Sequence, residues 1–329
     1  MSLLPAINDL PARTAMGLPE GYAEQEWSAL ERAAAGLLAF DPGSLPEIAE
    51  NPDEPFARRH AAGLIAAVAG DPRIVPDSPA MCPVPAGRYR IGIAPGTVDA
   101  VVREFAELGV RRPWIEKETP AHQVWLDAFA IGRYPVTNGE YARFLAASGH
   151  RPLPSCWRLG VLAAAERNQP VYGITAGCAD AYAAWLAART GRGFRLPSEA
   201  EWEVAAGGGE TIYPWGDEFA PDRANTAEAG LFCATPVGIF PRGASPFGCL
   251  DMAGNVEEFV ADAYRPYPGG RFVEDDLAAA DPAYRIARGG SFTRFRDLAR
   301  CTRRHGEFRS ALYAIGFRLA ETLPDGGRG

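Results

Sequence analysis

The stretch 245–260 reads SPFGCLDMAGNVEEFV, and with RIARGGSF at 285–292 and IGFRLA at 315–320 it decides the fold of this chain. Each segment joins a short apolar run to glycine, proline or asparagine. Short apolar runs that end in such residues are typical of strands and tight turns, not of long helices. The region from about residue 79 onward is therefore predicted to consist of short strands, a few helices and many irregular loops.

A few helices are expected among these loops. TNGEYARFLAASG offers Thr137 as an N-cap, and TAGCADAYAAWLAARTG is bounded by Thr175 and Gly191. In PSEAEWEVAA, Ser198 and Glu201 have the spacing of a capping box, in which each side chain accepts a backbone N–H of the other residue. QVWLDAFAIG and FRLAE are the clearest strand candidates.

Residues 20–78 have a different character, because apolar residues recur there at helical spacing. The two segments are YAEQEWSALERAAAGLLAF and EPFARRHAAGLIAAVAG, the second with Pro55 at its start and Gly70 at its end. Two helices bury little surface by themselves. We therefore expect a helical extension at 1–78 and a larger domain at 79–325. His60 lies beside the apolar face of the second helix and is expected to be a structural histidine at the boundary of that face.

Composition excludes several classes of protein. The 33 basic and 41 acidic residues of this 329-residue chain give a net charge of −8, which argues against nucleic acid as a partner. No apolar run approaches the ~18 residues of a membrane span. The six cysteines are scattered and the first residues do not resemble a signal peptide, so a reducing, cytoplasmic location is expected. Lys117 is the one lysine among the basic residues, and all the others are arginines. We attribute this preference for arginine to codon usage and not to a binding function.

Further segments identify a family when they are read in order with the three quoted first. They are VPAGRYRIG at 84–92, ETPAHQVWLDAFAIGRYPVTNGEYARFL at 118–145, GRGFRLPSEAEWEVAAGGG at 191–209 and YPWGDEF at 213–219. Over roughly residues 80–322 the chain resembles the formylglycine-generating enzyme family, also called the sulfatase-modifying-factor domain. The resemblance implies a C-type-lectin-like α+β fold with little regular secondary structure.

The same resemblance implies several kinds of chemistry. Formylglycine-generating enzymes oxidise a substrate cysteine with molecular oxygen at a copper ion bound by two cysteines. Ergothioneine-type sulfoxide synthases add a helical domain with iron-binding histidines, and pyoverdine-maturation proteins modify peptide natural products. Other members only bind partners.

The copper-binding cysteines of the family have no counterpart here. They are expected two and seven residues after the phenylalanine of RGGSF, where this chain has Arg294 and Ala299. Cu(I) requires soft thiolate ligands, and an arginine remains protonated. Cys301 lies two residues further on, but one thiol does not make a two-sulfur site. Copper-dependent formylglycine formation is therefore not expected.

Iron is left as an alternative. The helical-domain motif His-x-x-x-His-x-Glu is missing, since the extension contains only His60. A site within the domain would use His122, His305 and nearby carboxylates in a facial triad. The competing interpretation gives these histidines structural hydrogen bonds. The reacting centre is expected near Ser291, Arg294, Cys301 and His305.

A calcium site is predicted at LDMAGNVEEF, which resembles the second calcium loop of the family. The resemblance implies carboxylate ligands from Asp251 and Glu258 and main-chain carbonyl ligands from Gly254 and Val256. Oxygen ligands of this kind suit a hard cation. The alternative is a turn in which the two carboxylates accept backbone N–H groups. The first calcium loop looks degraded, because Asn225 and Thr226 fit but Ala229 replaces an acid.

Arginines are concentrated near the C-terminal end of the domain. They either bind an anionic substrate or pair internally with carboxylates, and Arg288 and Arg318 are expected to be structural. Arg296, Arg300, Arg303 and Arg304 are the predicted substrate-binding residues. The seven arginines of this segment are Arg288, Arg294, Arg296, Arg300, Arg303, Arg304 and Arg309.

Two functions remain at this level. The first is a metal-dependent oxidase or oxygenase that tailors a peptide, thiol or amine substrate. The second is a non-catalytic, lectin-like module that binds a ligand or a protein. The identity of the substrate and the oligomeric state are not encoded in any of these motifs.

Overall fold

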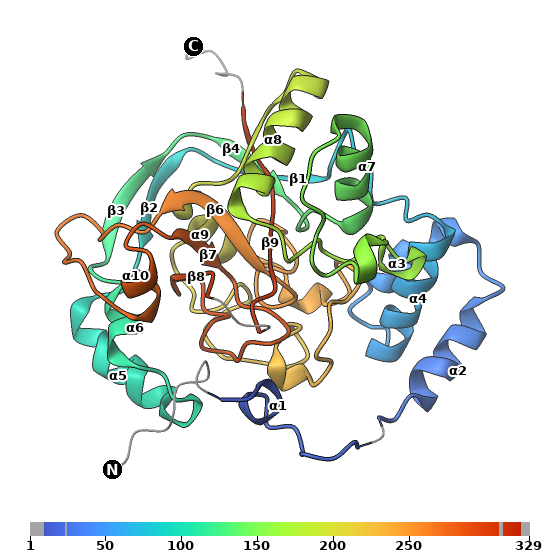
Figure 1. The fold of residues 1–329 in the computed structure, drawn as a ribbon, viewed down its shortest axis with the longest axis horizontal. Coiled ribbons are helices and arrows are strands. Elements are labelled where there is room, and N and C mark those ends of the chain that lie inside the picture. Colours follow the sequence, from blue (N-terminus) through green and yellow to red (C-terminus); the bar gives the residue numbers. More distant parts are fainter. Residues whose placement is uncertain (1–9, 24, 309–311, 324–329) are drawn as a thin grey trace.

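The computed structural model describes residues 10–23, 25–308 and 312–323, and it has the mixed α+β fold that the sequence predicts (Figure 1). Short helices surround small sheets, and loops connect most elements. The helices are α1 Ala12–Ala15, α2 Ser28–Leu37, α3 Leu45–Ala49, α4 Phe56–Ala69, α5 Val98–Glu104, α6 Arg112–Glu116, α7 Asn138–Ser148, α8 Ala176–Thr190, α9 Glu199–Gly207 and α10 Asp276–Ala280.

The strands form separate small sheets. One has the order β1-β4-β10-β5, another pairs β2 with β3, and a third has the order β8-β7-β6-β9. Both strand-like sequences are confirmed: QVWLDAFAIG forms β3 and β4, and FRLAE contributes to β9 and β10. The strands are β1 Met81–Val84, β2 Gly87–Ile91, β3 His122–Leu126, β4 Phe129–Gly132, β5 Gly193–Arg195, β6 Glu257–Ala263, β7 Arg285–Arg288, β8 His305–Gly306, β9 Ile315–Phe317 and β10 Ala320–Thr322.

The sheet β8-β7-β6-β9 positions the candidate site. Phe259 of β6 is opposite Ala287 of β7, and Ala287 is opposite His305 of β8. Because side chains alternate between the two faces of a sheet, Glu257, two residues before Phe259, shares a face with His305. Glu258 points to the other face, where its register partner is Arg288. The side chains of the adjacent residues Glu257 and Glu258 therefore lie on opposite faces of the sheet and contact different residues.

The predicted helix caps are present. Thr137 and Glu140 form a capping box at the start of α7, and Ser198 and Glu201 form another at the start of α9. Such caps satisfy backbone N–H groups that have no partner within the helix. Thr175 caps α8, which ends at Gly191 in a left-handed conformation.

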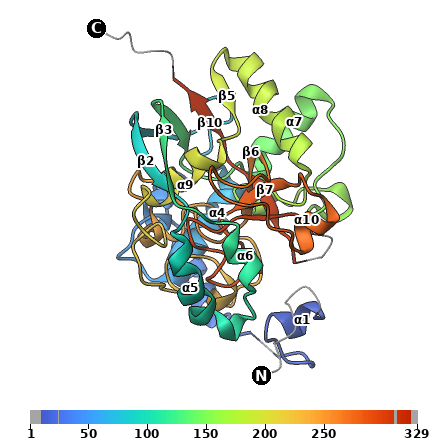
Figure 2. The same ribbon diagram turned by 90° about the vertical axis from the view of Figure 1, so that its left-hand side faces the viewer.

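Helices α2, α3 and α4 pack on the larger domain at one side of the molecule. Leu37, Leu45 and Ala62 are buried in one cluster with Ile239 and Phe240 of the domain. Figure 1 shows α5 and α6 on the opposite side from α2 and α4, and in Figure 2 α5 and α6 face the viewer. The two predicted helices correspond to α2 and α4, whereas the short helix α3 between them was not predicted. No helix of the described ranges is long and apolar enough to cross a membrane.

Candidate functional site

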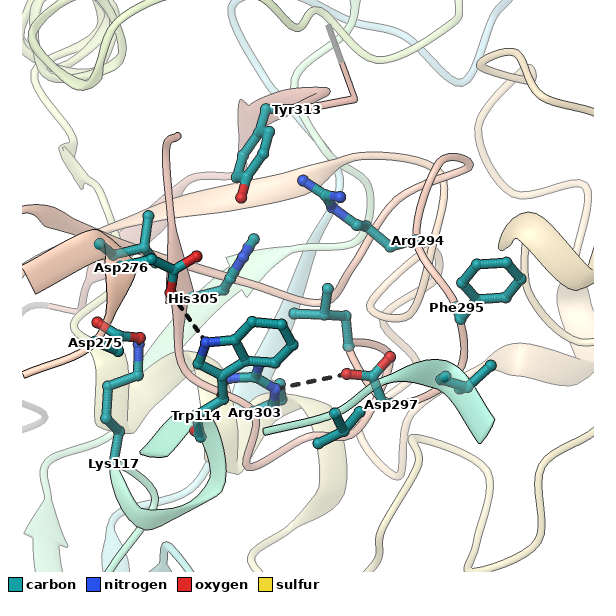
Figure 3. Close-up of a pocket in the computed structure, with 14 residues that line it drawn as sticks. Trp114, Lys117, Asp275, Asp276, Arg294, Phe295, Asp297, Arg303, His305 and Tyr313 are labelled. Carbon is teal, nitrogen blue, oxygen red and sulfur yellow. Dashed lines mark hydrogen bonds and ion pairs between the residues drawn. The ribbon is translucent and has the colours of Figure 1, made fainter. Parts of the chain in front are cut away.

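A cavity lies between α6, α10 and the arginine-rich segment 294–305 (Figure 3). The cavity itself has a volume of about 30 Å³, and the empty space rises to about 490 Å³ when its opening to solvent is included. We call it the His305 cavity. Its lining combines aromatic, aliphatic and charged side chains: Leu108, Val110, Trp114, Lys117, Asp275, Asp276, Leu277, Arg294, Phe295, Asp297, Leu298, Arg303, His305 and Tyr313.

His305 and Glu257 form a buried pair at this cavity. The Nδ1 atom of His305 lies 2.5 Å from Oε2 of Glu257, and the glutamate is 0 % exposed. An ionised carboxylate only accepts hydrogen bonds, so the imidazole proton is on Nδ1. The Nε2 atom then carries a lone pair. Such a pair has the geometry of a general base whose ring is oriented by a carboxylate.

The charges at this pair follow from burial and from its neighbours. Burial lowers the pKa of His305 below its ordinary value of 6.5, and Glu257 only partly opposes that effect. Burial tends to raise the pKa of Glu257, but the protonated form of His305, which exists only below the lowered pKa of that ring, and the charge of Arg294 outweigh it and lower that pKa. At neutral pH the pair is therefore a neutral imidazole beside a carboxylate, which leaves His305 able to accept a proton.

Arg294 completes this group at the position of a copper cysteine. Its Nε donates to Oε1 of Glu257 over 3.2 Å, and its guanidinium carbon lies 4.0 Å from the ring centre of Tyr313. The same tyrosine ring stacks on His305, with centroids 5.3 Å apart. The Nη2 atom of Arg294 is buried and has no hydrogen-bond partner among the described residues. A buried donor without a partner favours an acceptor from a ligand.

The opposite wall of the cavity comes from α6 and α10. Trp114 donates from Nε1 to Oδ1 of Asp276 over 2.9 Å, and this contact ties the two helices together (Figure 3). Arg303 donates to the carbonyl oxygen of Trp114 and lies 3.8 Å from Asp297. Arg303 therefore supports the wall of the cavity from within the protein.

Two residues of the predicted reacting centre lie outside the cavity lining. Ser291 is buried, and its hydroxyl oxygen lies 3.1 Å from that of Thr293. Cys301 lines a second cavity of about 240 Å³ beside Arg300 and Glu203. Burial raises the pKa of the Cys301 thiol, which keeps it protonated. The structure thus brings together Arg294 and His305, but not all four predicted residues.

The arginines predicted to bind substrate are mostly engaged within the protein. Arg300 makes two hydrogen bonds to Glu118, and Arg304 makes two to Glu199. Arg296 is more exposed and pairs with Glu107 and Glu228. Arg303 is the one of the four that lines the His305 cavity. Of the two alternatives for these arginines, internal pairing with carboxylates therefore applies to most of them. Arg309 lies outside the described residues.

The donor groups for copper and iron do not fit these metals. The copper positions hold Arg294 and Ala299, which offer no thiolate. Among the residues that the structure describes, no three His, Cys, Asp or Glu side chains gather into a group that could hold a metal. His122 bonds through Nδ1 to the carbonyl oxygen of Pro120 and packs on Tyr267, which is the structural alternative.

The predicted calcium loop is closely packed. A Cβ atom at Gly254 would lie 2.5 Å from the carbonyl oxygen of Asn225, so only glycine fits there. Asp251 accepts the N–H of Gly238, and burial raises its pKa to about 6. Both oxygens of Glu258 are occupied by hydrogen bonds from Arg318, and one also accepts from Trp202. A calcium ion would have to displace these donors, so the carboxylates do not fit the ion in this arrangement.

Chelation tests the calcium prediction. Because Glu258 already has its partners, we expect EDTA to change the melting temperature by less than about 1 °C, since a ligand stabilises a fold only by binding it. Circular dichroism with excess CaCl2 or EDTA measures this. A fall of several degrees in EDTA that is lost in Asp251→Ala would show instead that the loop binds calcium.

Glu257, Tyr313 and Trp114 are the site residues that sequence reasoning missed. Glu257 had a usable signal, because an acid in a buried strand requires a partner. Trp114 is distant from His305 in the sequence, and Tyr313 lies outside the motifs quoted above. Nothing in the sequence marks either residue as part of the site.

Comparison with known proteins agrees with the fold. Residues 68–323 match the sulfatase-modifying factor enzyme 1-like domain. The chain belongs to this family. In structure, it is similar to PvdO from Pseudomonas aeruginosa, with a TM-score of 0.56, 31 % identity, and coverage of 75 % of this chain and 95 % of that one.

Proteins that are similar to this chain in sequence are named for different activities. Serine/threonine-protein kinase pkn1 of Chlamydia caviae is 35 % identical over 62 % of this chain and 34 % of its own length. Hercynine oxygenase of Mycolicibacterium thermoresistibile is 34 % identical over 63 % of this chain and 53 % of its own. Inactive C-alpha-formylglycine-generating enzyme 2 of Mus musculus is 30 % identical over 74 % and 86 %. The chain thus spans only a third to a half of the first two proteins.

Proposed function

We propose that the chain is a tailoring enzyme that binds a small molecule or peptide end bearing a thiol or amine and takes a proton from it at His305. The observation that carries this proposal is the 2.5 Å contact between His305 Nδ1 and Glu257 Oε2, which orients the ring and leaves Nε2 as its acceptor. A neutral, oriented imidazole is the usual general base at neutral pH.

The unpartnered nitrogen of Arg294 is the reason to expect an anionic group on the substrate. Its unpartnered Nη2 is available to a carboxylate, and guanidinium groups suit such ligands. Hydrogen bonds to charged groups contribute about 1.5–3 kcal/mol. Arg294→Met is therefore expected to weaken binding of a carboxylate-bearing ligand by roughly tenfold to a hundredfold. The oxidation expected from the family is assigned to none of the described side chains, because their donor sets fit neither copper nor iron.

Turnover of candidate substrates tests the proposal. Amino acids and short peptides with free thiols or amines are incubated with the protein, with and without added Fe(II) or Cu(I), and followed by mass spectrometry and oxygen uptake. His305→Gln is expected to reduce the rate about 10²–10⁴-fold, the usual contribution of a general base. His122→Gln is the matched control and should retain the rate. Turnover that survives His305→Gln would contradict the assignment of the base.

A binding module is the second candidate, and a specific observation favours it. The chain matches 86 % of the length of a mouse protein whose name records an inactive enzyme, and the copper positions hold Arg294 and Ala299. This candidate predicts ligand affinity that depends on Arg294 together with no chemical change in the ligand. Binding without turnover across the substrate panel would favour it over the enzyme.

A further inference from the structure

Lys117 is the one lysine in a chain of 329 residues, and it lines the His305 cavity. It follows directly after helix α6, and its side chain is 0 % exposed. Figure 3 shows Lys117 and Asp275 on the side of the cavity away from Arg294, with Trp114 between them. The proposed function makes no use of this residue.

The surroundings of the amine combine a carboxylate, a phenol and aromatic faces. Nζ contacts Oδ2 of Asp275 and lies 3.0 Å from the hydroxyl oxygen of Tyr284. The ring centres of Tyr264 and Tyr284 lie 5.6 and 5.3 Å away. The other carboxylate oxygen of Asp275 accepts the N–H of Ala278 at the start of α10, so the aspartate is fixed in place. The amine therefore has a fixed proton acceptor and a fixed hydroxyl beside it.

Burial changes the ionisation of this amine. It lowers the pKa of Lys117 to about 8, because desolvation outweighs the attraction of Asp275. A neutral amine is a nucleophile, and buried lysines with lowered pKa values are the ones that form Schiff bases. An arginine could also carry the positive charge opposite Asp275, but its guanidinium remains protonated and is not a nucleophile.

We propose that Lys117 is an amine nucleophile that captures small carbonyl compounds, aldehydes or α-keto acids, as an imine at this wall of the His305 cavity. The inference rests on the contacts of Lys117 and does not depend on His305 acting as a base.

The reaction balances without an oxidant or a reductant. The ammonium group first gives a proton to the carboxylate of Asp275. The lone pair of Nζ then forms a bond to the carbonyl carbon, while the C=O π pair moves to the oxygen, which takes the proton back from Asp275 and leaves the positive charge on the nitrogen. The resulting carbinolamine loses its hydroxyl group with a proton from nitrogen as one molecule of water, which leaves a C=N bond.

Reductive trapping with glyoxylate tests this proposal on the unmodified chain. Cyanoborohydride reduces the imine to a stable secondary amine, and peptide mass mapping locates it. The α-amino group at the N-terminus is the one other aliphatic amine, and it falls in a different peptide. The rate at Lys117 is compared between the folded protein and the protein in concentrated urea at pH 7.4.

The two interpretations of Lys117 predict opposite rate ratios. With a pKa of about 8, roughly 20 % of the folded protein carries a neutral amine at this pH. In the unfolded chain, a pKa near 10.4 leaves about 0.1 % neutral. Trapping is therefore expected to be at least about tenfold faster in the folded protein. A purely structural ion pair would be shielded, so slower trapping in the folded protein would overturn the proposal.

Two variants define the specificity of the test. Lys117→Arg keeps a positive charge opposite Asp275 and removes the primary amine, so no adduct is expected at position 117. His305→Gln should leave trapping at Lys117 unchanged, which separates this proposal from the general-base function. An adduct that depends on His305 would show that the two residues act as one site and would contradict the independence stated here.

Discussion

Replacing Arg318 by methionine is expected to lower the free energy of unfolding by about 3–5 kcal/mol, as for the loss of one partner of a buried ion pair. Arg318 and Glu258 are both 0 % exposed, and they are joined by hydrogen bonds of 2.6 and 2.7 Å. Arg318 also donates to the carbonyl oxygens of Gly132 and Leu250. Removal of the guanidinium leaves a buried carboxylate without compensation. Urea unfolding followed by tryptophan fluorescence measures the loss.

Two further variants serve as controls for the Arg318→Met variant. Arg189 pairs with Asp77 at the surface, where solvent screens the charges, so Arg189→Met should have a much smaller effect. The double replacement Glu258→Gln with Arg318→Met should recover part of the loss, because no buried charge remains unpaired. If Arg318→Met costs no more than Arg189→Met, then the buried pair does not hold the sheets together.

Glu257→Gln is expected to have an effect of similar size, about 3–5 kcal/mol, for a related reason. Arg294 is 1 % exposed and would be left in the interior without its carboxylate. Adding Arg294→Met to the variant should recover part of the stability. The amide also removes the charge that raises the pKa of His305, so that pKa should fall further below 6.5. Unfolding and the histidine titration are measured on the same samples.

The pH dependence of the Glu257 variant has a definite sign. The folded pKa of Glu257 lies below its ordinary value of 4.5, so its contribution to stability is present above pH 4.5 and is lost as the pH falls through the folded pKa. The stability gap between the natural protein and Glu257→Gln should therefore shrink on acidification below pH 4.5. Urea midpoints measured across this range decide the matter, and a gap that stays constant or grows would contradict the charged state assigned to Glu257.

Local signals account for what the sequence predicted well. Thr137, Ser198 and Gly191 mark helix ends by interactions that span only a few residues, so those helix boundaries can be predicted from the sequence. The family resemblance supplied the α+β fold class, whereas the order of the strands in the sheets was not predicted, because no local pattern encodes it. The short helix α3 was missed because its five residues are too few to show a helical period.

The site was harder to predict because its contacts are distant in sequence. Arg300 and Arg304 look like a positive patch until their partners Glu118 and Glu199 are located, more than 100 residues earlier. Glu257 and His305 are 48 residues apart, and their contact depends on the register of three strands. A shift by one residue would turn Glu257 to the other face. Such a register cannot be read from charge or spacing alone.

The protonation state of His305 tests the central claim most directly. The chain has four histidines, so ¹⁵N-labelled histidine gives a simple spectrum, and His305→Gln assigns the signals of His305. Long-range ¹H–¹⁵N correlation at pH 7 should show a neutral ring protonated on Nδ1, with Nε2 unprotonated and a pKa below 6.5. An imidazolium at pH 7, or a neutral ring protonated on Nε2, would contradict the proposal that His305 accepts a proton from the substrate.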